Sequence, residues 1–182
     1  MTSNKKCVGV VPFGDVPVIA LKVIAAHISG YLDLLPEILP PLKLPEHAFD
    51  QKRLQYDAGI ILRSFESMDF NPCEKVIGVL QPDLFVPIFE HVFGEARQGE
   101  QCAVISLFRL NKNPDGSFPT TAIVYERAAK VALHELGHLY DLYHCEDEKC
   151  LMHFSGGLDD LDATSLYLCR YCATYLKYNI SH

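Results

Sequence analysis

The sequence lacks any apolar run long enough to cross a bilayer, which takes about 20 residues. The apolar segment near its beginning, Val8 to Val11, is followed at once by Pro12, Gly14 and Pro17, so it does not form the core of a signal peptide. We therefore expect a cytoplasmic protein with no membrane partner.

Basic residues are also in short supply. The chain has 16 Lys and Arg against 23 Asp and Glu, a formal net charge of −7. Binding to a phosphate backbone needs clustered basic side chains, so the composition argues against a nucleic-acid partner. Internal repeats, low-complexity tracts and flexible linkers are absent as well. With 182 residues, 49% of them hydrophobic, the chain has the size and core content of one domain, 1–182, which we take as a monomer by default.

Apolar residues occur with the periods of strands and helices in turn. Short apolar runs predict strands at Cys7–Pro12, Lys75–Leu80 and Cys102–Leu110. Helical spacing predicts helices at Val16–Leu34, at Gln51–Met68, from Pro119 through His138, and from an N-cap at Asp162 through Tyr178. Strands alternating with helices indicate an α/β fold, in which helices pack on a sheet.

The central motif is a cluster of histidines, His134-Glu-Leu-Gly-His138 followed by Leu-Tyr-Asp-Leu-Tyr-His144. Residues four apart lie one above the other on a helix, so His134 and His138 can offer two imidazoles to one cation. His144 can supply a third only if the chain turns sharply after Tyr140. Three neutral imidazoles that leave one position open form the typical catalytic zinc site.

Glu135 lies beside the first histidine and can reach a water bound to the metal rather than the metal itself. We therefore predict a zinc-dependent metallopeptidase in which Glu135 is the general base for a zinc-activated water. One alternative is a zinc-bound peptide-binding or regulatory module with little or no turnover. Another is a site that binds a different divalent metal and performs a different hydrolysis. The glutamate favours an enzyme, because a structural site needs no base.

A cluster of cysteines follows the histidines: Cys145-x4-Cys150 begins directly after His144, and Cys169-x2-Cys172 comes later. Two short-spaced cysteine pairs are typical of a tetrahedral zinc held by four thiolates, which would contribute folding energy. The alternatives are two disulfides, which a cytoplasmic location disfavours, and four free thiols, which the ligand spacing disfavours. We predict a structural zinc here, and so two zinc ions in all. The remaining cysteines lie in or beside apolar runs and are interpreted as small core side chains: Cys7, Cys73 and Cys102.

The run from His134 to His144, then Cys145-x4-Cys150-x-Met152 and Cys169-x2-Cys172, resembles the archaemetzincin family of metzincin zinc metallopeptidases. Other metzincins lack the four cysteines, so the joint pattern is specific. The resemblance implies that Met152 lies in a tight turn beneath the metal as a packing base. It also implies a metzincin-like α/β fold: a mixed sheet with packed helices, an active-site helix, this Met-turn and a C-terminal helix.

The same resemblance implies a peptide or protein substrate. The substrate would bind in a cleft between an upper subdomain, about residues 1–141, and a lower subdomain, about residues 142–182. An edge strand of the upper part would pair with the extended peptide, and we expect Cys102–Leu110 to be that strand.

Two positions depart from the pattern that the resemblance implies. Asp141 stands where the family usually has glycine, at a turn that needs a positive φ, which Asp tolerates better than most residues. Phe154 stands two residues after Met152, where some metzincins carry a tyrosine as an extra metal ligand. We therefore expect no such ligand here.

Overall fold

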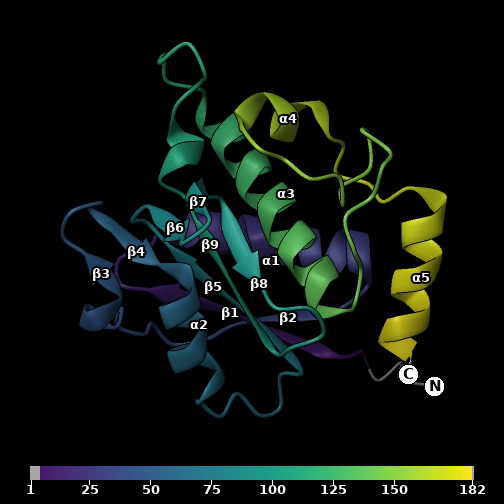
Figure 1. Cartoon of the computed structure of the whole chain (residues 1–182). Coiled ribbons are helices and arrows are strands. Elements are labelled where there is room, and N and C mark those ends of the chain that lie inside the picture. Colours follow the sequence, from purple (N-terminus) through teal and green to yellow (C-terminus); the bar gives the residue numbers. More distant parts are fainter. Residues whose placement is uncertain (1–4, 182) are drawn as a thin grey trace.

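The computed structural model describes residues 5–181; residues 1–4 and 182 lie outside the described part of the chain. It confirms the α/β fold, with one five-stranded sheet of order β2-β1-β5-β9-β8 and one four-stranded sheet of order β3-β4-β6-β7 (Figure 1). The strands of the larger sheet are β1 (Cys7–Phe13), β2 (Leu35–Ile38), β5 (Lys75–Leu80), β8 (Gly94–Ala96) and β9 (Cys102–Ser106). Those of the smaller sheet are β3 (Phe49–Asp50), β4 (Gln55–Asp57), β6 (Leu84–Val86) and β7 (Phe89–Val92). The helices are α1 (Val18–Leu32), α2 (Ala58–Glu66), α3 (Thr121–Leu139), α4 (Leu158–Ala163) and α5 (Arg170–Ser181), with 3-10 turns η1 (Glu46–Ala48) and η2 (Arg109–Asn111).

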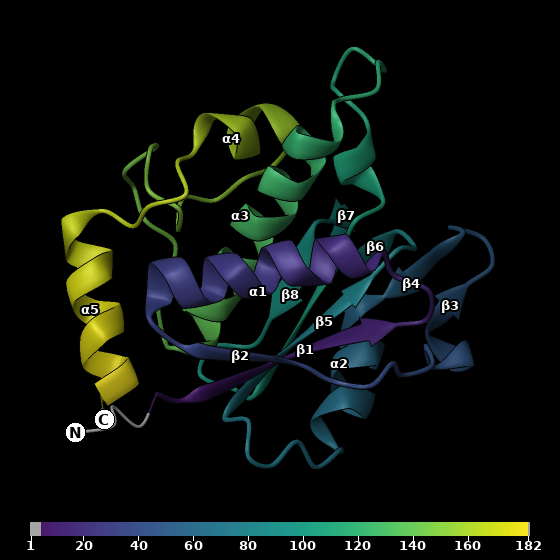
Figure 2. The ribbon, with the colours of Figure 1, turned by 180° about the vertical axis from the view of Figure 1, so that it is seen from behind.

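The larger sheet is covered by helices on both faces. Its strands β2, β1, β5 and β9 run parallel, and β8 is antiparallel to β9. One core lies between the sheet and helices α1 and α3, and a second lies between the sheet and α2 (Figures 1 and 2). Burial on both faces explains why the central strands β5 and β9 are continuous apolar runs rather than alternating ones.

The larger sheet ends in β2 on one side and in β8 on the other, and the position of β8 beyond β9 corrects the sequence-based expectation. The segment Cys102–Leu110 was predicted to be the substrate-binding edge, but β9 lies between β5 and β8 and ends at Ser106. The edge strand on this side, β8, has three residues and begins with a glycine, within a polar segment that carries no period-2 apolar pattern. The prediction was wrong because burial of both faces, and not edge position, makes a strand apolar.

Several element boundaries also differ from the prediction. Within Gln51–Met68 the helix begins only at Ala58, because Gln55–Asp57 is strand β4 and the Asp57 carboxylate caps α2 by accepting from the Ile60 N–H (3.1 Å). Asp162 does not cap the final helix: it lies within α4, and α5 begins at Arg170. Cys7 and Cys73, expected as separate core side chains, are joined by a disulfide.

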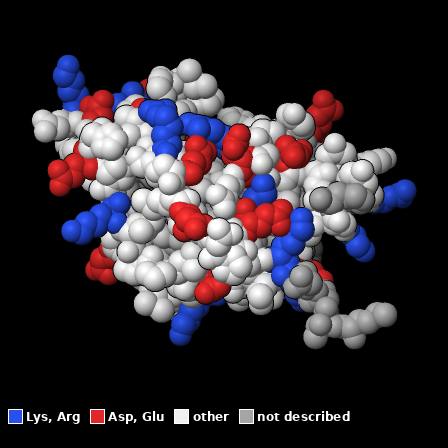
Figure 3. All heavy atoms as spheres, turned by 90° about the horizontal axis from the view of Figure 1, so that it is seen from below, with Lys and Arg blue, Asp and Glu red and all other residues white. Residues whose placement is uncertain are grey.

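Within residues 5–181, no helix combines the length and the apolar character needed to cross a membrane. On the face shown in Figure 3, acidic and basic side chains are interspersed and the described basic residues form no continuous patch. That face therefore offers no extended positive surface, in keeping with the net charge of −7.

Candidate active site and metal centres

Helix α3 carries three of the residues singled out by the motif, His134, Glu135 and His138. The helix begins with Thr120 as N-cap and ends at Leu139, where the chain makes the expected sharp turn. Asp141 takes φ +63°, the left-handed conformation for which glycine is favoured, and the Leu142 N–H donates to Gly137 O (3.0 Å). This turn reverses the chain, so that the residues after it run back beside α3.

The turn brings His144 to the two helix histidines. The Nε2 atom of His138 lies 3.1 Å from His134 Nε2 and 3.2 Å from His144 Nε2. Nitrogens bound to one tetrahedral zinc at 2.0–2.1 Å would lie about 3.3 Å apart, so the three side chains fit such an ion. The structure thus brings the three predicted ligands together.

Backbone carbonyls fix which ring nitrogens can bind a metal. Leu151 O lies 2.8 Å from His134 Nδ1, and Leu142 O lies 2.7 Å from His138 Nδ1. A carbonyl only accepts, so each Nδ1 carries the proton and donates, and each Nε2 keeps a free lone pair. Burial lowers the pKa of His134 to about 3 and also lowers the pKa of His138, and so both rings are neutral at neutral pH.

Met152 lies beneath these histidines and is fully buried. A Cβ added at Gly137 would come within 2.5 Å of Met152 Sδ, so only glycine lets the methionine approach the helix this closely. Gly137 is therefore a packing residue. The buried position of Met152 against α3 agrees with the role of packing base that the resemblance implied.

Glu135 lies on the other flank of the histidines, against the edge strand β8. A Cβ added at Gly94 would lie 2.8 Å from Glu135 Oε1, so the glycine of β8 makes room for the carboxyl group. Burial raises the pKa of Glu135 well above its usual value, and the charge of Glu95 adds to the effect. Sequence reasoning did not find Gly94, because a lone glycine in a polar segment gives no sign that it faces the carboxyl group of Glu135.

The histidines and Glu135 line a cleft of about 580 Å³. One side of it is formed by β7 and β8, and the other by α4 and the segment from Leu151 to Gly156. Phe154 stands at the mouth, where its ring packs against that of His144 (centroids 5.2 Å apart). As expected, this position offers no hydroxyl to a metal.

The four clustered cysteines form a second potential metal site, which begins at Cys145, the residue directly after His144. Their Sγ atoms all lie within 4.8 Å of one another, and Cys145 Sγ is 3.8 Å from Cys169 Sγ. Sulfurs bound to one tetrahedral zinc at about 2.3 Å would lie about 3.8 Å apart, so the four thiols also fit an ion. Burial alone would raise the pKa of Cys169, but hydrogen bonds from Cys172 and the other thiols lower it overall, whereas burial raises the pKa of Cys150 and of Cys172.

His153 follows Met152 and holds the segment between the two clusters. Its side chain is half-buried and its Nδ1 donates to Cys145 O (3.0 Å), while the Cys145 N–H donates to Met152 O (2.8 Å). Both backbone groups of Cys145 are thus held by the Met152–His153 turn, which braces the junction between the two clusters.

Comparison with known proteins gives one consistent family. Residues 20–178 match the sequence profile of Peptidase family M54. The archaemetzincin of Pyrococcus abyssi is 35% identical over 179 residues (94% of this chain, 95% of the relative), and that of Pyrococcus horikoshii is 38% identical over 137 residues (74% and 72%). The crystal structure of archaemetzincin from Methanopyrus kandleri matches with a TM-score of 0.88 at 32% identity, covering 100% of this chain and 99% of that one. The archaemetzincin from Archaeoglobus fulgidus, complexed with malonate, matches with a TM-score of 0.80 at 29% identity (93% and 99%). The chain therefore belongs to Peptidase family M54, the archaemetzincins, and is a zinc metallopeptidase.

Proposed function

We propose that this chain hydrolyses peptide bonds at the histidine cluster, with Glu135 as its general base. The observation that carries the proposal is the convergence of three imidazole Nε2 atoms, on the wall of a cleft that Glu135 also lines. The residues that would hold the catalytic zinc are His134, His138 and His144. Those that would hold a second, structural zinc are Cys145, Cys150, Cys169 and Cys172.

Zinc held by three neutral imidazoles supplies Lewis acidity, which acidifies water and polarises a carbonyl group. The remaining steps belong to the chain itself. A carboxylate oxygen of Glu135 accepts a proton from the attacking water, while the oxygen of that water bonds to the carbonyl carbon. Glu135 then delivers that proton to the leaving nitrogen as the C–N bond breaks, so one residue serves as base and acid in turn.

We further propose that an extended substrate pairs with the outer edge of β8. This strand hydrogen-bonds to β9 on one side only and borders the cleft beside Glu135, which supports strand addition there. The proposed division into an upper part, about residues 1–141, and a lower part, about 142–182, is supported by the cleft walls. Ala96 comes from the upper part, and Leu151 and Phe154 come from the lower.

The test is Glu135→Gln, which keeps the shape of the side chain and removes its basicity. We expect peptide hydrolysis to fall by at least about 10²-fold, since general acid–base catalysis typically contributes about 10²–10⁴-fold. Zinc content, measured by elemental mass spectrometry, should be unchanged. Glu90→Gln, at an exposed glutamate of β7, is the matched control and should keep wild-type activity. Hydrolysis retained in the Glu135→Gln protein would refute the general-base assignment.

A further inference from the structure

The cleft extends from the histidines towards α4, and its far wall is apolar. This part of the cleft is lined by Val131 of α3, by Leu151 of the loop after the cysteines' first pair, and by Leu161 of α4. A volume of about 580 Å³ is within the usual range for ligand pockets and leaves room for a large side chain. An apolar recess beside the proposed hydrolytic centre would take a bulky apolar side chain of the substrate, because burying it there removes apolar surface from water.

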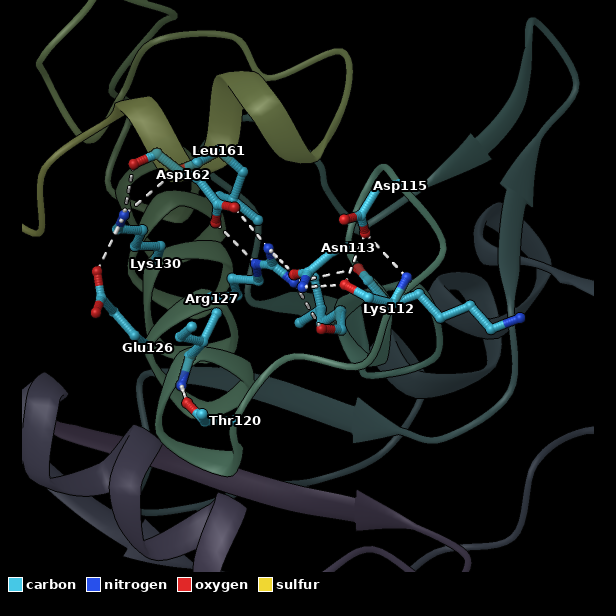
Figure 4. Close-up of polar contacts among 12 residues, drawn as sticks. Lys112, Asn113, Asp115, Thr120, Glu126, Arg127, Lys130, Leu161 and Asp162 are labelled. Atoms are coloured by element: carbon cyan, nitrogen blue, oxygen red, sulfur yellow. Dashed lines mark hydrogen bonds and ion pairs between the residues drawn. The ribbon is translucent and has the colours of Figure 1, made fainter.

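The position of Leu161 depends on a short helix. Helix α4 has six residues, which is below the length at which a helix is stable by itself. It must therefore be held by tertiary contacts, and two buried cations of α3 supply them (Figure 4). These are Arg127 and Lys130, with exposed fractions of 2% and 3%.

Arg127 uses all five of its N–H donors. Its Nε and one Nη donate to the two carboxylate oxygens of Asp162 in α4 (2.7 and 2.5 Å). The other donors reach Leu110 O (3.1 Å) and, as Figure 4 shows, Lys112 O (3.2 Å) and the Asn113 side-chain oxygen (3.0 Å). A planar guanidinium with every donor engaged fixes its partners in both distance and direction. Arg127 thus holds the end of α4 and the segment after η2 against α3.

Lys130 holds the same helix one turn closer to the histidines. Its three ammonium protons match three acceptors: Leu161 O (3.2 Å), Asp162 O (3.5 Å) and the Glu126 carboxylate (3.2 Å) (Figure 4). Lys130 also lines the cleft, and it precedes His134 by one helical turn on the same face. One side chain therefore borders the recess and binds the backbone of the residue that forms its far wall.

We infer that Arg127 and Lys130 are positioning residues that set the side-chain specificity of the cleft. They fix Leu161 relative to His134 and His138, because the helix that carries the histidines also carries both cations. This inference rests on the proposed function for the identity of the site, and its measurable consequence is the preference of the cleft for a large apolar residue beside the cleaved bond. Loosening α4 should relax that preference without disturbing the histidines.

The experiment compares peptides that differ in one residue next to the cleaved bond, as Ala, Val, Leu or Phe. The variant is Lys130→Met, which keeps the stem and removes the three hydrogen bonds. We expect wild-type kcat/KM to favour Leu or Phe over Ala by about 10-fold or more, the discrimination that apolar pockets achieve. Lys130→Met should reduce this ratio by about 10-fold, through KM rather than kcat, with zinc content unchanged.

Two further variants separate specificity from general stability. Lys149→Met is the matched control, because Lys149 Nζ also donates to a carbonyl of α4, Ala163 O (3.2 Å), but this lysine is exposed and does not line the cleft, so its bond holds α4 only weakly. It should keep the wild-type preference. Asp162→Asn weakens the bond to Arg127 while leaving both cations in place, and should relax the preference as Lys130→Met does. If Lys130→Met does not fold, Asp162→Asn decides the question.

Failure of this inference can be told apart from failure of the proposed function. Binding of the same peptides to the Glu135→Gln protein, measured by calorimetry, reports side-chain preference without turnover. Preferential binding of Leu and Phe peptides that Lys130→Met abolishes in this background would support the inference even if the wild-type protein cleaved none of them. A preference that is equal in the wild-type and Lys130→Met proteins, or that falls equally in Lys149→Met, would overturn it.

Discussion

The histidine cluster and the cysteine cluster are separated by one peptide bond, between His144 and Cys145, yet they are built in opposite ways. Two of the three histidines lie on α3, a helix of 19 residues packed into the larger core. The cysteines come from a loop and from the beginning of α5, a helix with one buried residue, Leu176. The first cluster lines a cleft, and in the second four thiols face one another.

This difference separates two uses of metal-binding residues. The histidines are positioned by a helix that is stable for other reasons, so a metal there is free to serve chemistry. The cysteines bring together a loop and α5, which bury few apolar side chains of their own. A metal there would therefore supply the folding energy that apolar burial supplies elsewhere. Replacing single residues of the two clusters, and of the segments that support them, tests this contrast.

The largest effect should come from Cys169→Ser. Loss of one thiol from the proposed four-sulfur site would remove the zinc that we propose holds the loop and α5 together. We expect unfolding free energy to fall by at least about 3 kcal/mol, because zinc binding to small domains is worth about 10–16 kcal/mol. This corresponds to a decrease in Tm of about 6–12 °C for a chain of this size.

The measurement is thermal unfolding followed by circular dichroism, with zinc counted by elemental mass spectrometry. The zinc count should fall from two per chain to one. Cys102→Ala is the control, because Cys102 is a buried thiol of β9 outside the cluster, and it should leave the zinc count unchanged. Two zinc ions retained in Cys169→Ser would refute the four-thiolate assignment.

His144→Ala should have the converse effect. It removes the third imidazole from the open site and leaves the thiols intact. We expect zinc affinity at the histidines to fall by more than about 10²-fold, since even residues that only support a ligand contribute about 10–100-fold. Hydrolysis should disappear while Tm stays close to that of the wild type.

A chelator titration measures this effect, because the weakened site should lose its zinc at far lower chelator concentration. His27→Ala, at a histidine of α1 that is not part of the cluster, should lose zinc at the same chelator concentration as the wild-type protein. If Tm fell as far in His144→Ala as in Cys169→Ser, the proposed contrast between the two clusters would be wrong.

The sequence predicted the two clusters well because both depend on spacing along short segments. The i, i+4 pair on α3 and the return of His144 after Asp141 follow from helix geometry and from one turn. The wall opposite them could not be predicted in this way. Strand β8 is short and polar, and its place at the edge is decided by pairing with β9, which no local pattern encodes. The bonds from Arg127 to Asp162 join residues 35 apart in sequence, so they too required the fold.

Gly137→Ala should have an intermediate effect, because it tests how closely Met152 must pack beneath the histidines. The added methyl group would come within 2.5 Å of Met152 Sδ and so must push the methionine away from α3. Overpacking of this kind costs about 1–3 kcal/mol of unfolding free energy. Urea denaturation measures that cost. In the double variant with Met152→Ala, the loss of unfolding free energy should be smaller than the sum of the two single losses. Additive losses would show that the added methyl group does not press on Met152.

The smallest effect should come from Asp141, where backbone and side chain can be separated. At φ +63° a residue without Cβ avoids a steric cost, so Asp141→Gly should be stabilised or unchanged, within about 1 kcal/mol. Asp141→Ala has the steric cost without the polar side chain that tolerates this conformation, and should be less stable than Asp141→Gly by about 1 kcal/mol. Urea denaturation of the pair gives the difference directly. If alanine were as stable as glycine, the left-handed backbone at this position would carry no steric cost, and this account of the turn before His144 would be wrong.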